Sequence, residues 1–383
     1  MTLWKVFQVE AKLIFSDIAI VLTILGGVIL YSFLYPQPYA KQSVSKLHVS
    51  VVDLDKSEIS RQIIYELDAT PQVEITRQDM SQKDALMALE ETKVKAVVII
   101  PQHFYRDLNL GKSPTIAIGA DSSYFLIYGA VLEGAMKAVL TESAKIKVVN
   151  LLKKDVPLTS AKEAYTPYSI NAINLFNKDN SYTEYVVPAV FILILQQTLL
   201  IGLGILGGGV NERLKKGELM DYREARTYQV MFSRFVIFGT IFFVHMLFYF
   251  GFSYEIFHIN HVANIADLLC FGTLFLLAVI AFGIFLGSLF SSREIATPVI
   301  LFSSLPLVFS VGFVWPLEAM PDFVRYLSFL SPSTPAMKGF LELNQMGANL
   351  SMLHTELTLL LIQLLVYTIL GYYIINKKRK AYE

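Results

Sequence analysis

Long apolar stretches separated by short polar ones make up most of this chain. Six of them reach about 18 residues or more, the length that an α-helix needs to cross a lipid bilayer. They run from Ile18 to Tyr35, Tyr185 to Val210, Phe235 to Tyr254, Leu268 to Phe290, Ile295 to Trp315 and Leu357 to Ile375. The pattern predicts an α-helical polytopic membrane protein with six transmembrane helices.

Residues 41–184, between the first two apolar stretches, follow a different pattern. Short runs rich in β-branched residues predict four strands, LHVSVVD, QVEIT, VKAVVII and TIAIGAD. Between the strands, apolar residues recur at helical spacing, as at Ile59, Ile63 and Leu67, and a long helix is expected from Tyr124 to about Lys154. This alternation predicts an inserted external α/β domain in which helices cover a small mixed or parallel sheet.

Composition supports a membrane location and gives no reason to expect a nucleic-acid partner. Hydrophobic residues make up 54% of the chain and charged residues 17%, against about 25% charged residues in soluble proteins. The formal net charge is zero, so the charge of the whole chain gives no reason to expect a nucleic-acid partner. The single cysteine, Cys270, excludes an intrachain disulfide, and its apolar neighbours predict a buried thiol rather than a nucleophile or metal ligand.

Basic residues in the short connections predict the orientation. Lys and Arg are concentrated between the second and third apolar stretches and after the sixth, whereas the connection from about Glu255 to Asp267 has none. By the positive-inside rule, both termini are then cytoplasmic and the inserted domain is external. The predicted organisation is a cytoplasmic interfacial helix at 1–16, a first transmembrane helix at 17–40, the external domain at 41–184, and transmembrane helices 2 to 6 at 185–383.

One short motif resembles a nucleotide site but does not complete the pattern. Gly111-Lys112-Ser113 matches the end of a P-loop, but Arg106 occupies the position of the first glycine and Pro114 follows at once. A plain turn is therefore the better interpretation. The sequence contains no complete P-loop, no H-E-x-x-H metal motif and no G-x-S-x-G elbow. We expect neither a cofactor nor a metal on this chain, and any ATP that drives it must bind to another one.

The segment after the fifth apolar stretch, residues 316–347, is broken by prolines and yet stays apolar. The prolines are Pro316, Pro321, Pro332 and Pro335. Irregular backbone at membrane depth is tolerable only where protein or a water-filled cavity satisfies its polar groups. The residues leave two interpretations open: a re-entrant segment that acts as a gate, or an amphipathic loop on the outer membrane surface.

The N-terminal segment MTLWKVFQVEAKLIF predicts an amphipathic helix. Trp4, Phe7, Ala11 and Ile14 share one helical face in this sequence. This pattern is typical of a helix that lies at a membrane interface. Two roles remain open for Trp4 and Phe7, a contact with an ATPase and a simple membrane anchor.

A second segment, residues 211–228, is predicted to form a charged cytoplasmic coupling helix. Its candidate coupling residues are Glu212, Arg213, Lys216 and Gly217. Basic residues alone would suit anionic lipid, but the added acidic residues, among them Glu218, Asp221 and Glu224, favour a protein partner of mixed charge. The alternative is a basic flank that only sets the orientation of the neighbouring helices.

Three polar side chains within the apolar stretches are candidate pathway residues. They are Gln196, Gln197 and His245. An ionisable residue inside a membrane is a functional candidate, although a neutral imidazole also serves simply to bond a neighbouring helix. The two glutamines could likewise join helices or line a pathway, and the sequence does not decide between these roles.

Four phrases of the sequence together resemble one family. They are VVDLDKSEISRQ, AVVIIPQHFYRDLNLGKSPTIAIGADSS, YVVPAVFILILQQTLL leading into NERLKKGELMDY, and FVWPLEAMP with SPSTPAMKGFLELNQMG. In this order they are similar to type-2 ATP-binding-cassette (ABC) exporter permease subunits that have a large external domain between the first two transmembrane helices. Relatives commonly carry E-R-E-x-G-T after the second helix, whereas this chain has Asn211 to Glu218, so the correspondence at Glu212, Arg213 and Gly217 is approximate.

The resemblance implies a function, partners and a location. Such a permease moves a small amphipathic molecule, drug or lipid out of the cytoplasm or the inner leaflet of a bacterial plasma membrane. ATP and Mg²⁺ bind to separate ABC ATPase subunits, which contact the cytoplasmic helices. Two permease chains, identical or paralogous, form the pathway, and a periplasmic accessory protein is a further expected partner. The resemblance also implies two re-entrant helices before the last transmembrane helix.

A membrane receptor that senses a ligand with its external α/β domain is the main alternative. Six transmembrane helices exceed what signalling requires, and the chain encodes no cytoplasmic output domain. A membrane enzyme ranks third because no catalytic constellation is present in the sequence. The sequence therefore favours a transporter subunit rather than an enzyme.

Overall fold

A computed structural model describes residues 1–39, 45–110, 112–165, 175–177, 181–218 and 224–381. The chain divides into two compact units. We call residues Met1–Gln42 with Asn174–Glu383 the membrane unit, and residues Ser43–Ile173 the inserted unit. The inserted unit thus begins and ends within the segment 41–184 that the sequence predicted as a domain.

Six helical spans in the described part of the membrane unit are long and apolar enough to cross a bilayer, which confirms the prediction. The first consists of α2 (Ile18–Val21), the π-helix η1 (Leu22–Gly27), α3 (Val28–Leu34) and η2 (Gln37–Tyr39). The third consists of α11 (Thr227–Leu247), the π-helix η3 (Phe248–Ser253) and α12 (Tyr254–Ile256). The remaining spans are α9 (Tyr182–Lys215), α13 (Ile265–Leu289), α14 (Arg293–Ser310) and α17 (His354–Ala381).

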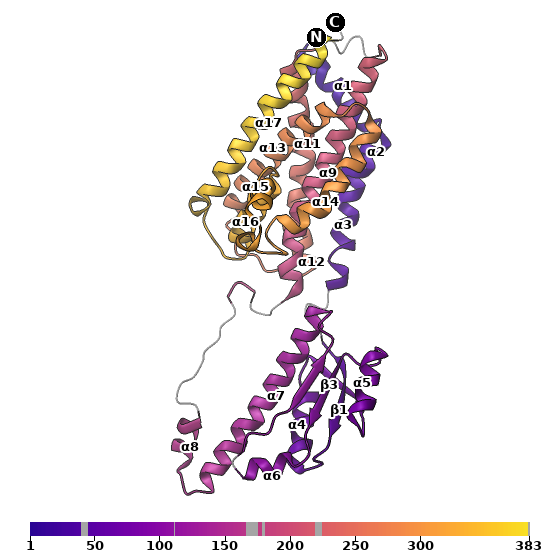
Figure 1. The fold of residues 1–383 in the computed structure, drawn as a ribbon. Helices are drawn as coiled ribbons and strands as arrows, with labels where there is room; N and C mark the ends of the chain where they lie inside the picture. Colours follow the sequence, from indigo (N-terminus) through magenta and orange to yellow (C-terminus); the bar gives the residue numbers. More distant parts are fainter. Residues whose placement is uncertain (40–44, 111, 166–174, 178–180, 219–223, 382–383) are drawn as a thin grey trace. The chain divides into compact units, whose positions relative to one another are not determined.

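Short helices precede the first span and separate the last two (Figure 1). Helix α1 (Leu3–Phe15) comes before the first span. Between α14 and α17 the chain forms η4 (Leu317–Ala319), α15 (Asp322–Ser328), α16 (Ser333–Asn344) and η5 (Leu350–Met352). Both termini lie at the same end of the membrane unit (Figure 1), as an even number of spans requires.

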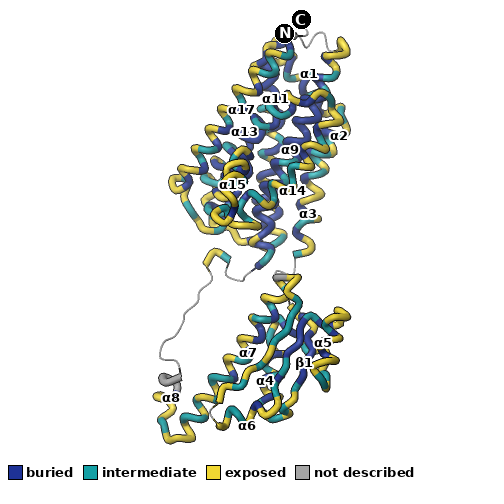
Figure 2. Tube along the Cα trace, in the orientation of Figure 1, coloured by how far each residue is buried: buried dark blue, intermediate teal, exposed yellow. Residues whose placement is uncertain are grey.

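Helix α9 forms the centre of the membrane unit. Its most apolar stretch is 94% buried, and it packs against α13, α14 and α16, as the continuous dark tube in Figure 2 shows. A helix that is apolar on all sides is expected to be enclosed in this way. Gly207 and Gly208 permit the closest approaches, because a Cβ there would lie only 2.5 Å from the Gly287 oxygen and 2.3 Å from the Ser292 oxygen, respectively.

Helix α1 is amphipathic, but its buried face differs from the predicted one. Val6, Glu10 and Ile14 are buried, and the helix packs against α11. Trp4, which the sequence pattern grouped with Ile14, is 67% exposed. The difference arises because Glu10, a carboxylate that any hydropathy pattern places outside, is completely buried.

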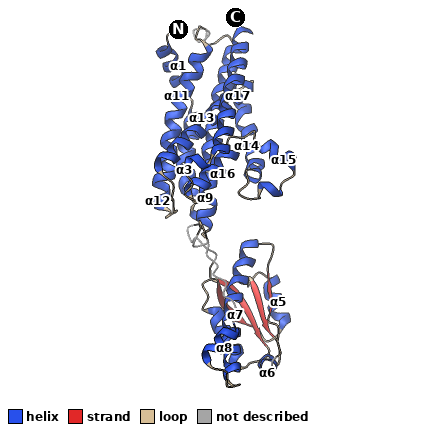
Figure 3. Cartoon of the chain, turned by 90° about the vertical axis from the view of Figure 1, so that its left-hand side faces the viewer, coloured by secondary structure: helices blue, strands red, loops and turns tan. Residues whose placement is uncertain are grey.

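The inserted unit contains a mixed four-stranded sheet (Figure 3). Its strands are β1 (Leu47–Asp53), β2 (Val73–Gln78), β3 (Ala96–Ile100) and β4 (Ala117–Ala120), in the order β2-β1-β3-β4. Strand β1 is parallel to β2 and β3, whereas β4 is antiparallel to β3. All four predicted strands are confirmed.

Helices cover both faces of this sheet. They are α4 (Glu58–Asp68), α5 (Gln82–Glu90), α6 (Phe104–Asn109) and α7 (Phe125–Leu152), whereas α8 (Leu158–Tyr165) packs on α7. Leu67 of α4 and Val131 of α7 join one apolar cluster with β1, whereas Ala85 of α5 joins Val52 and Val97 in a second cluster. Adjacent strand residues point to opposite faces, so β1 supplies both clusters. The expected domain with helices covering a sheet is therefore confirmed.

The cysteine prediction was wrong. Cys270 lies on α13, but its side chain is exposed. In a transmembrane helix the exposed surface meets lipid rather than water, so an apolar sequence context does not require burial inside the protein.

Candidate functional site

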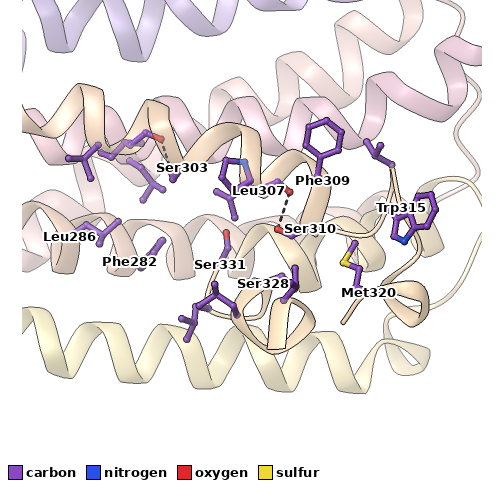
Figure 4. Close-up of a pocket in the computed structure, with 18 of the residues that line it drawn as sticks. Phe282, Leu286, Ser303, Leu307, Phe309, Ser310, Trp315, Met320, Ser328 and Ser331 are labelled. Carbon is purple, nitrogen blue, oxygen red and sulfur yellow. Dashed lines mark hydrogen bonds between the residues drawn. The ribbon is translucent and has the colours of Figure 1, made fainter. Parts of the chain in front are cut away.

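A groove of about 950 Å³ lies between α13, α14, α15 and the connections before and after α15 (Figure 4). Most of its lining is apolar and includes Phe282, Leu286, Leu307, Phe309, Trp315 and Met320. These residues come from the fourth and fifth spans and from the segment just after them. The groove is therefore built where the proline-rich segment 316–347 meets the bundle.

Four serines also line the groove, Ser303, Ser310, Ser328 and Ser331. The hydroxyls of the first three donate to carbonyl oxygens three residues earlier in the chain, at 2.7, 3.4 and 2.8 Å. The fourth belongs to a buried polar cluster with Gln196. Because these hydroxyl groups already have partners, the groove presents mainly hydrocarbon to a ligand.

Gln196 of α9 holds one side of the turn between α15 and α16. Its side chain is fully buried, and its oxygen accepts a hydrogen bond from the backbone N–H of Ser333 at 2.8 Å. Its amide nitrogen donates to the hydroxyl of Ser331 at 2.8 Å and to that of Ser333 at 3.1 Å. Gln196, a candidate pathway residue in the sequence, thus bonds the turn and does not line the groove.

Two side chains of α17 hold the other side of this turn. Gln363 donates to the carbonyl oxygen of Phe329 at 2.6 Å, and the Tyr367 hydroxyl donates to the carbonyl oxygen of Leu330. Helix α16 is largely buried and packs against α9, α13 and α17. Protein groups thus satisfy the polar backbone where the chain breaks before α16, which is what a re-entrant segment requires.

The four prolines lie at or near the starts of short helices. Pro316 directly precedes η4, Pro321 directly precedes α15, and Pro332 directly precedes α16. Pro335 lies in the first turn of α16, where a missing N–H removes no helical hydrogen bond. The prolines therefore start helices after the breaks, and Pro335 belongs to a helix rather than to the turn.

The other two candidate pathway residues are buried away from the groove lining. Both polar atoms of Gln197 are buried and have no hydrogen-bond partner within the described ranges. The His245 ring is buried, interacts with the backbone of Ile24 in the first span, and meets the Phe242 ring edge-on at 5.5 Å between centroids. His245 thus joins the third span to the first.

The start of the predicted coupling helix at 211–228 continues the second span, because α9 extends to Lys215. Glu212 and Arg213 belong to the last turn of α9, and Lys216 pairs with Glu212 at 2.7 Å. Gly217 follows with a φ of +76°, which ends the helix in a conformation that glycine tolerates best. Residues 219–223, with Asp221, lie outside the described residues, and α11 starts at Thr227.

Asp17 and Arg293 are functional candidates that the sequence analysis missed. Asp17 accepts a hydrogen bond from the backbone N–H of Ala19, which caps α2, and it pairs with Arg293 at 3.0 Å. Both line a cleft of about 210 Å³ together with Glu212 and Arg213. The ion pair joins residues 276 positions apart. The only signal for it in the sequence is that each charge lies just before an apolar stretch.

A second missed pair fixes α1 to α11. The guanidinium of Arg234 contacts the Glu10 carboxylate at 3.2 Å, with both side chains almost completely buried. The amide of Gln229 in α11 also donates to the backbone oxygen of Met1 at 3.2 Å. The rings of Trp4 and Phe7 on α1 stack at 5.6 Å between centroids, and Trp4 remains accessible to a partner.

The described residues of the membrane unit form a bundle of six apolar spans with an apolar groove. The model of the family described as ABC-2 family transporter protein matches residues 18–373. No curated protein matches the chain. Because the family match covers nearly all of the 383 residues, the chain belongs to the ABC-2 transporter family and is a type-2 ABC permease.

Proposed function

We propose that this chain is the permease subunit of an ATP-driven exporter for a small amphipathic molecule, drug or lipid with a substantial apolar part. The observation that carries this proposal is the groove between α13, α14 and α15, whose lining is almost entirely hydrocarbon. Burial of apolar surface contributes roughly 25 cal/mol per Å², so such a lining favours apolar ligands over polar ones. A separate ABC ATPase supplies the energy by hydrolysing Mg²⁺-bound ATP.

A second permease chain, identical or paralogous, completes the pathway. Helix α14 supports this proposal. It is the least apolar of the six spans, yet only 11% of its most apolar stretch is buried within the chain. A helix with several serines and two internal prolines, Pro298 and Pro306, suits contact with another protein better than contact with lipid alone. Two such helices from two chains would enclose a pathway beside the grooves.

Coupling to the ATPase takes place at the end of the membrane unit that holds both termini. We place this end in the cytoplasm of a bacterial cell, in agreement with the positive-inside rule. The proposed contacts are Trp4 and Phe7 on α1, and Glu212 to Gly217 at the end of the second span. The ion pair of Asp17 with Arg293 joins the start of α2, which follows α1, to the start of α14, and Glu212 lines the same cleft. Movement of these cytoplasmic elements can therefore reach α14 and the groove.

Coupling requires that the ATPase bind two conformations of the permease with different affinities. ATP binding shifts the permease toward an outward-open state only if the ATPase binds that state more tightly by several kcal/mol. The inserted unit then lies outside the cell, where a periplasmic accessory protein is a proposed partner. In this arrangement the membrane unit spans the bilayer and the inserted unit lies outside the cell.

Filling the groove tests the proposal. Ser303→Trp places a large ring in the groove, whereas Ser304→Trp changes the neighbouring serine, which does not line it. In proteoliposomes with the partner ATPase, we expect Ser303→Trp to abolish transport of a fluorescent phospholipid and of a lipophilic dye. Ser304→Trp should retain most of both activities. Equal transport by the two variants would exclude the groove as the substrate site.

Reversing charges tests the coupling site. Glu212→Lys with Arg213→Glu should weaken the complex with the ATPase or remove its stimulation by substrate, because like charges at an interface oppose association. The control reverses a comparable exposed pair, Asp322→Lys with Arg325→Asp, which lies 2.8 Å apart in α15. Wild-type copurification and transport by the first double variant would assign coupling to the region of Trp4 and Phe7 instead.

A further inference from the structure

Helix α7 of the inserted unit is much longer than the sheet that it covers. Its 28 residues extend about 42 Å, whereas the strands contain four to seven residues and extend about 13 to 23 Å. Val131, Ala135 and Ala138, which pack on the sheet, all lie in its first half. In the second half, which lies beyond these residues, Leu140 is exposed and Ile146 is partly buried, although α8 also packs on α7. This surplus apolar surface lies where the sheet no longer covers the helix.

A groove of about 360 Å³ uses that surface as one wall. Helix α6 and the segment 112–116, which leads into β4, form the rest of it together with Ile63 of α4. Its apolar lining includes Ile63, Phe104, Leu108, Ile116, Val139 and Leu140. Several of these residues also belong to the small apolar cluster around Ile100, so the floor of the groove continues the core of the unit.

The polar lining of the groove has one sign of charge. Ser143, Lys147 and Asn150 follow one another along one face of α7, and Lys112 and Ser113 come from the facing segment. The lining contains two lysines and no acidic residue. Asp107 lies nearby, 3.5 Å from Lys112, but Lys112 is well exposed, so this contact binds its ammonium group only weakly.

We propose that this groove binds an anionic single-chain amphiphile, with a carboxylate or phosphate head at Lys112 and Lys147 and its hydrocarbon chain along α6 and α7. The apolar floor excludes a fully polar anion, since it offers such a ligand no compensation for lost hydration. The two lysines discriminate against a cationic head, because like charges repel in a partly desolvated groove. Ser143 and Asn150 add hydrogen-bonding groups beside the charged head.

The site stands apart from transport because all of its residues belong to the inserted unit. Binding requires neither ATP nor the ATPase, so it can be measured on the permease alone in lipid nanodiscs. Failure of this inference therefore leaves the proposed export function untouched. Likewise, loss of transport in a variant of the α13 and α14 groove leaves binding in the inserted unit unchanged.

Photolabelling with palmitic acid that carries a diazirine in its chain tests the inference. Mass spectrometry of the labelled full-length protein should place the adduct within residues 104–116 or 139–150, and unlabelled palmitate should remove it. Lysophosphatidic acid should compete as well, whereas a hexadecyl chain with a trimethylammonium head should not. Competition by only one of the two anions would identify the head that the groove prefers and would support the site.

Variants decide whether the groove itself is responsible. Ser143→Trp fills it and should abolish the adduct, and Lys112→Glu with Lys147→Glu should lower labelling by roughly fivefold or more, as expected for the loss of two charge contacts. The control, Lys83→Glu with Lys93→Glu, changes two lysines that do not line the groove. Circular dichroism and size-exclusion elution confirm that each variant is folded. The proposal would be overturned if the cationic amphiphile competed as well as the anionic ones, or if the Ser143→Trp variant were labelled as strongly as the wild type.

Discussion

The two units of this permease differ in the polar contacts that hold them together, although the buried hydroxyls of Ser50 and Ser60 also bond carboxylates in the inserted unit. In the inserted unit, charged residues pair at the surface, as in Lys137 with Glu133 at 2.6 Å, and the three apolar clusters form the core. In the membrane unit, Gln196 and the pair of Glu10 with Arg234 are buried and have specific partners. A polar group in lipid has no water to bond, so its partner must come from its own helix or from a neighbouring one. Buried polar contacts therefore define the packing of the membrane unit, whereas surface pairs contribute little to the packing of the inserted unit.

Removing Glu10 should produce the largest effect. Glu10→Ala leaves the Arg234 guanidinium buried without its carboxylate, which typically costs about 3–5 kcal/mol. We expect poor yield of monodisperse protein and a strongly lowered thermal unfolding midpoint in detergent. The double variant Glu10→Met with Arg234→Met should recover much of that loss, because it removes both charges. An unchanged midpoint for Glu10→Ala would show that this buried pair does not hold α1 in place.

The second largest loss of stability is expected at Gln196, and the adjacent Gln197 provides a matched control. Gln196→Leu removes all the hydrogen bonds from α9 to the turn before α16 and leaves the Ser333 N–H unsatisfied, at a cost of about 1–3 kcal/mol. Gln197→Leu should be neutral or stabilising, since its amide has no partner in the described part of the chain. Thermal unfolding and substrate-stimulated ATPase activity measure both. The same loss in both variants would contradict a specific role for Gln196.

Tyr367→Phe should have a smaller effect on the same turn. It deletes one hydroxyl that donates to the Leu330 carbonyl oxygen while keeping the ring between Phe282 and Phe285. A single neutral hydrogen bond contributes about 0.5–1.5 kcal/mol, so the unfolding midpoint should fall less than in Gln196→Leu. The double variant with Gln196→Leu measures whether α9 and α17 hold the turn jointly. Strict additivity would indicate two independent contacts.

The smallest effect is expected at the surface of the inserted unit. The hydrogen bonds that Asp79 accepts from Arg77 and from the Ser50 hydroxyl hold the pKa of its carboxyl below the usual value. A depressed folded-state pKa stabilises the fold above the unfolded pKa, and this contribution is lost as the pH falls through the folded value. Asp79→Asn should therefore remove a small part of the acid sensitivity of the unit. Hydrogen exchange of β1 and β2 between neutral and acidic pH measures this difference, and identical profiles would contradict it.

Local patterns predicted the elements of both units well. Six spans, four strands and the covering helices of the sheet depend on apolar periodicity, which is a property of neighbouring residues. The same rule misplaced Trp4 and Cys270 and gave no sign that Glu10 is buried. In each case the apolar pattern was correct, but it does not say whether an apolar surface meets lipid or protein, or whether a buried charge has a partner.

The candidate sites depend on distances that the sequence does not contain. Composition alone indicated that residues 316–347 were too apolar for an ordinary loop, and the order of four phrases indicated the family. Only tertiary structure brought Gln196 to Ser333, 137 positions away, and Asp17 to Arg293, 276 positions away. It also placed Gln196 and His245 against neighbouring helices rather than in the groove. Secondary structure follows from local hydrophobic spacing and hydrogen bonding within each helix, whereas the partner of a buried polar group is fixed by which helix packs beside it.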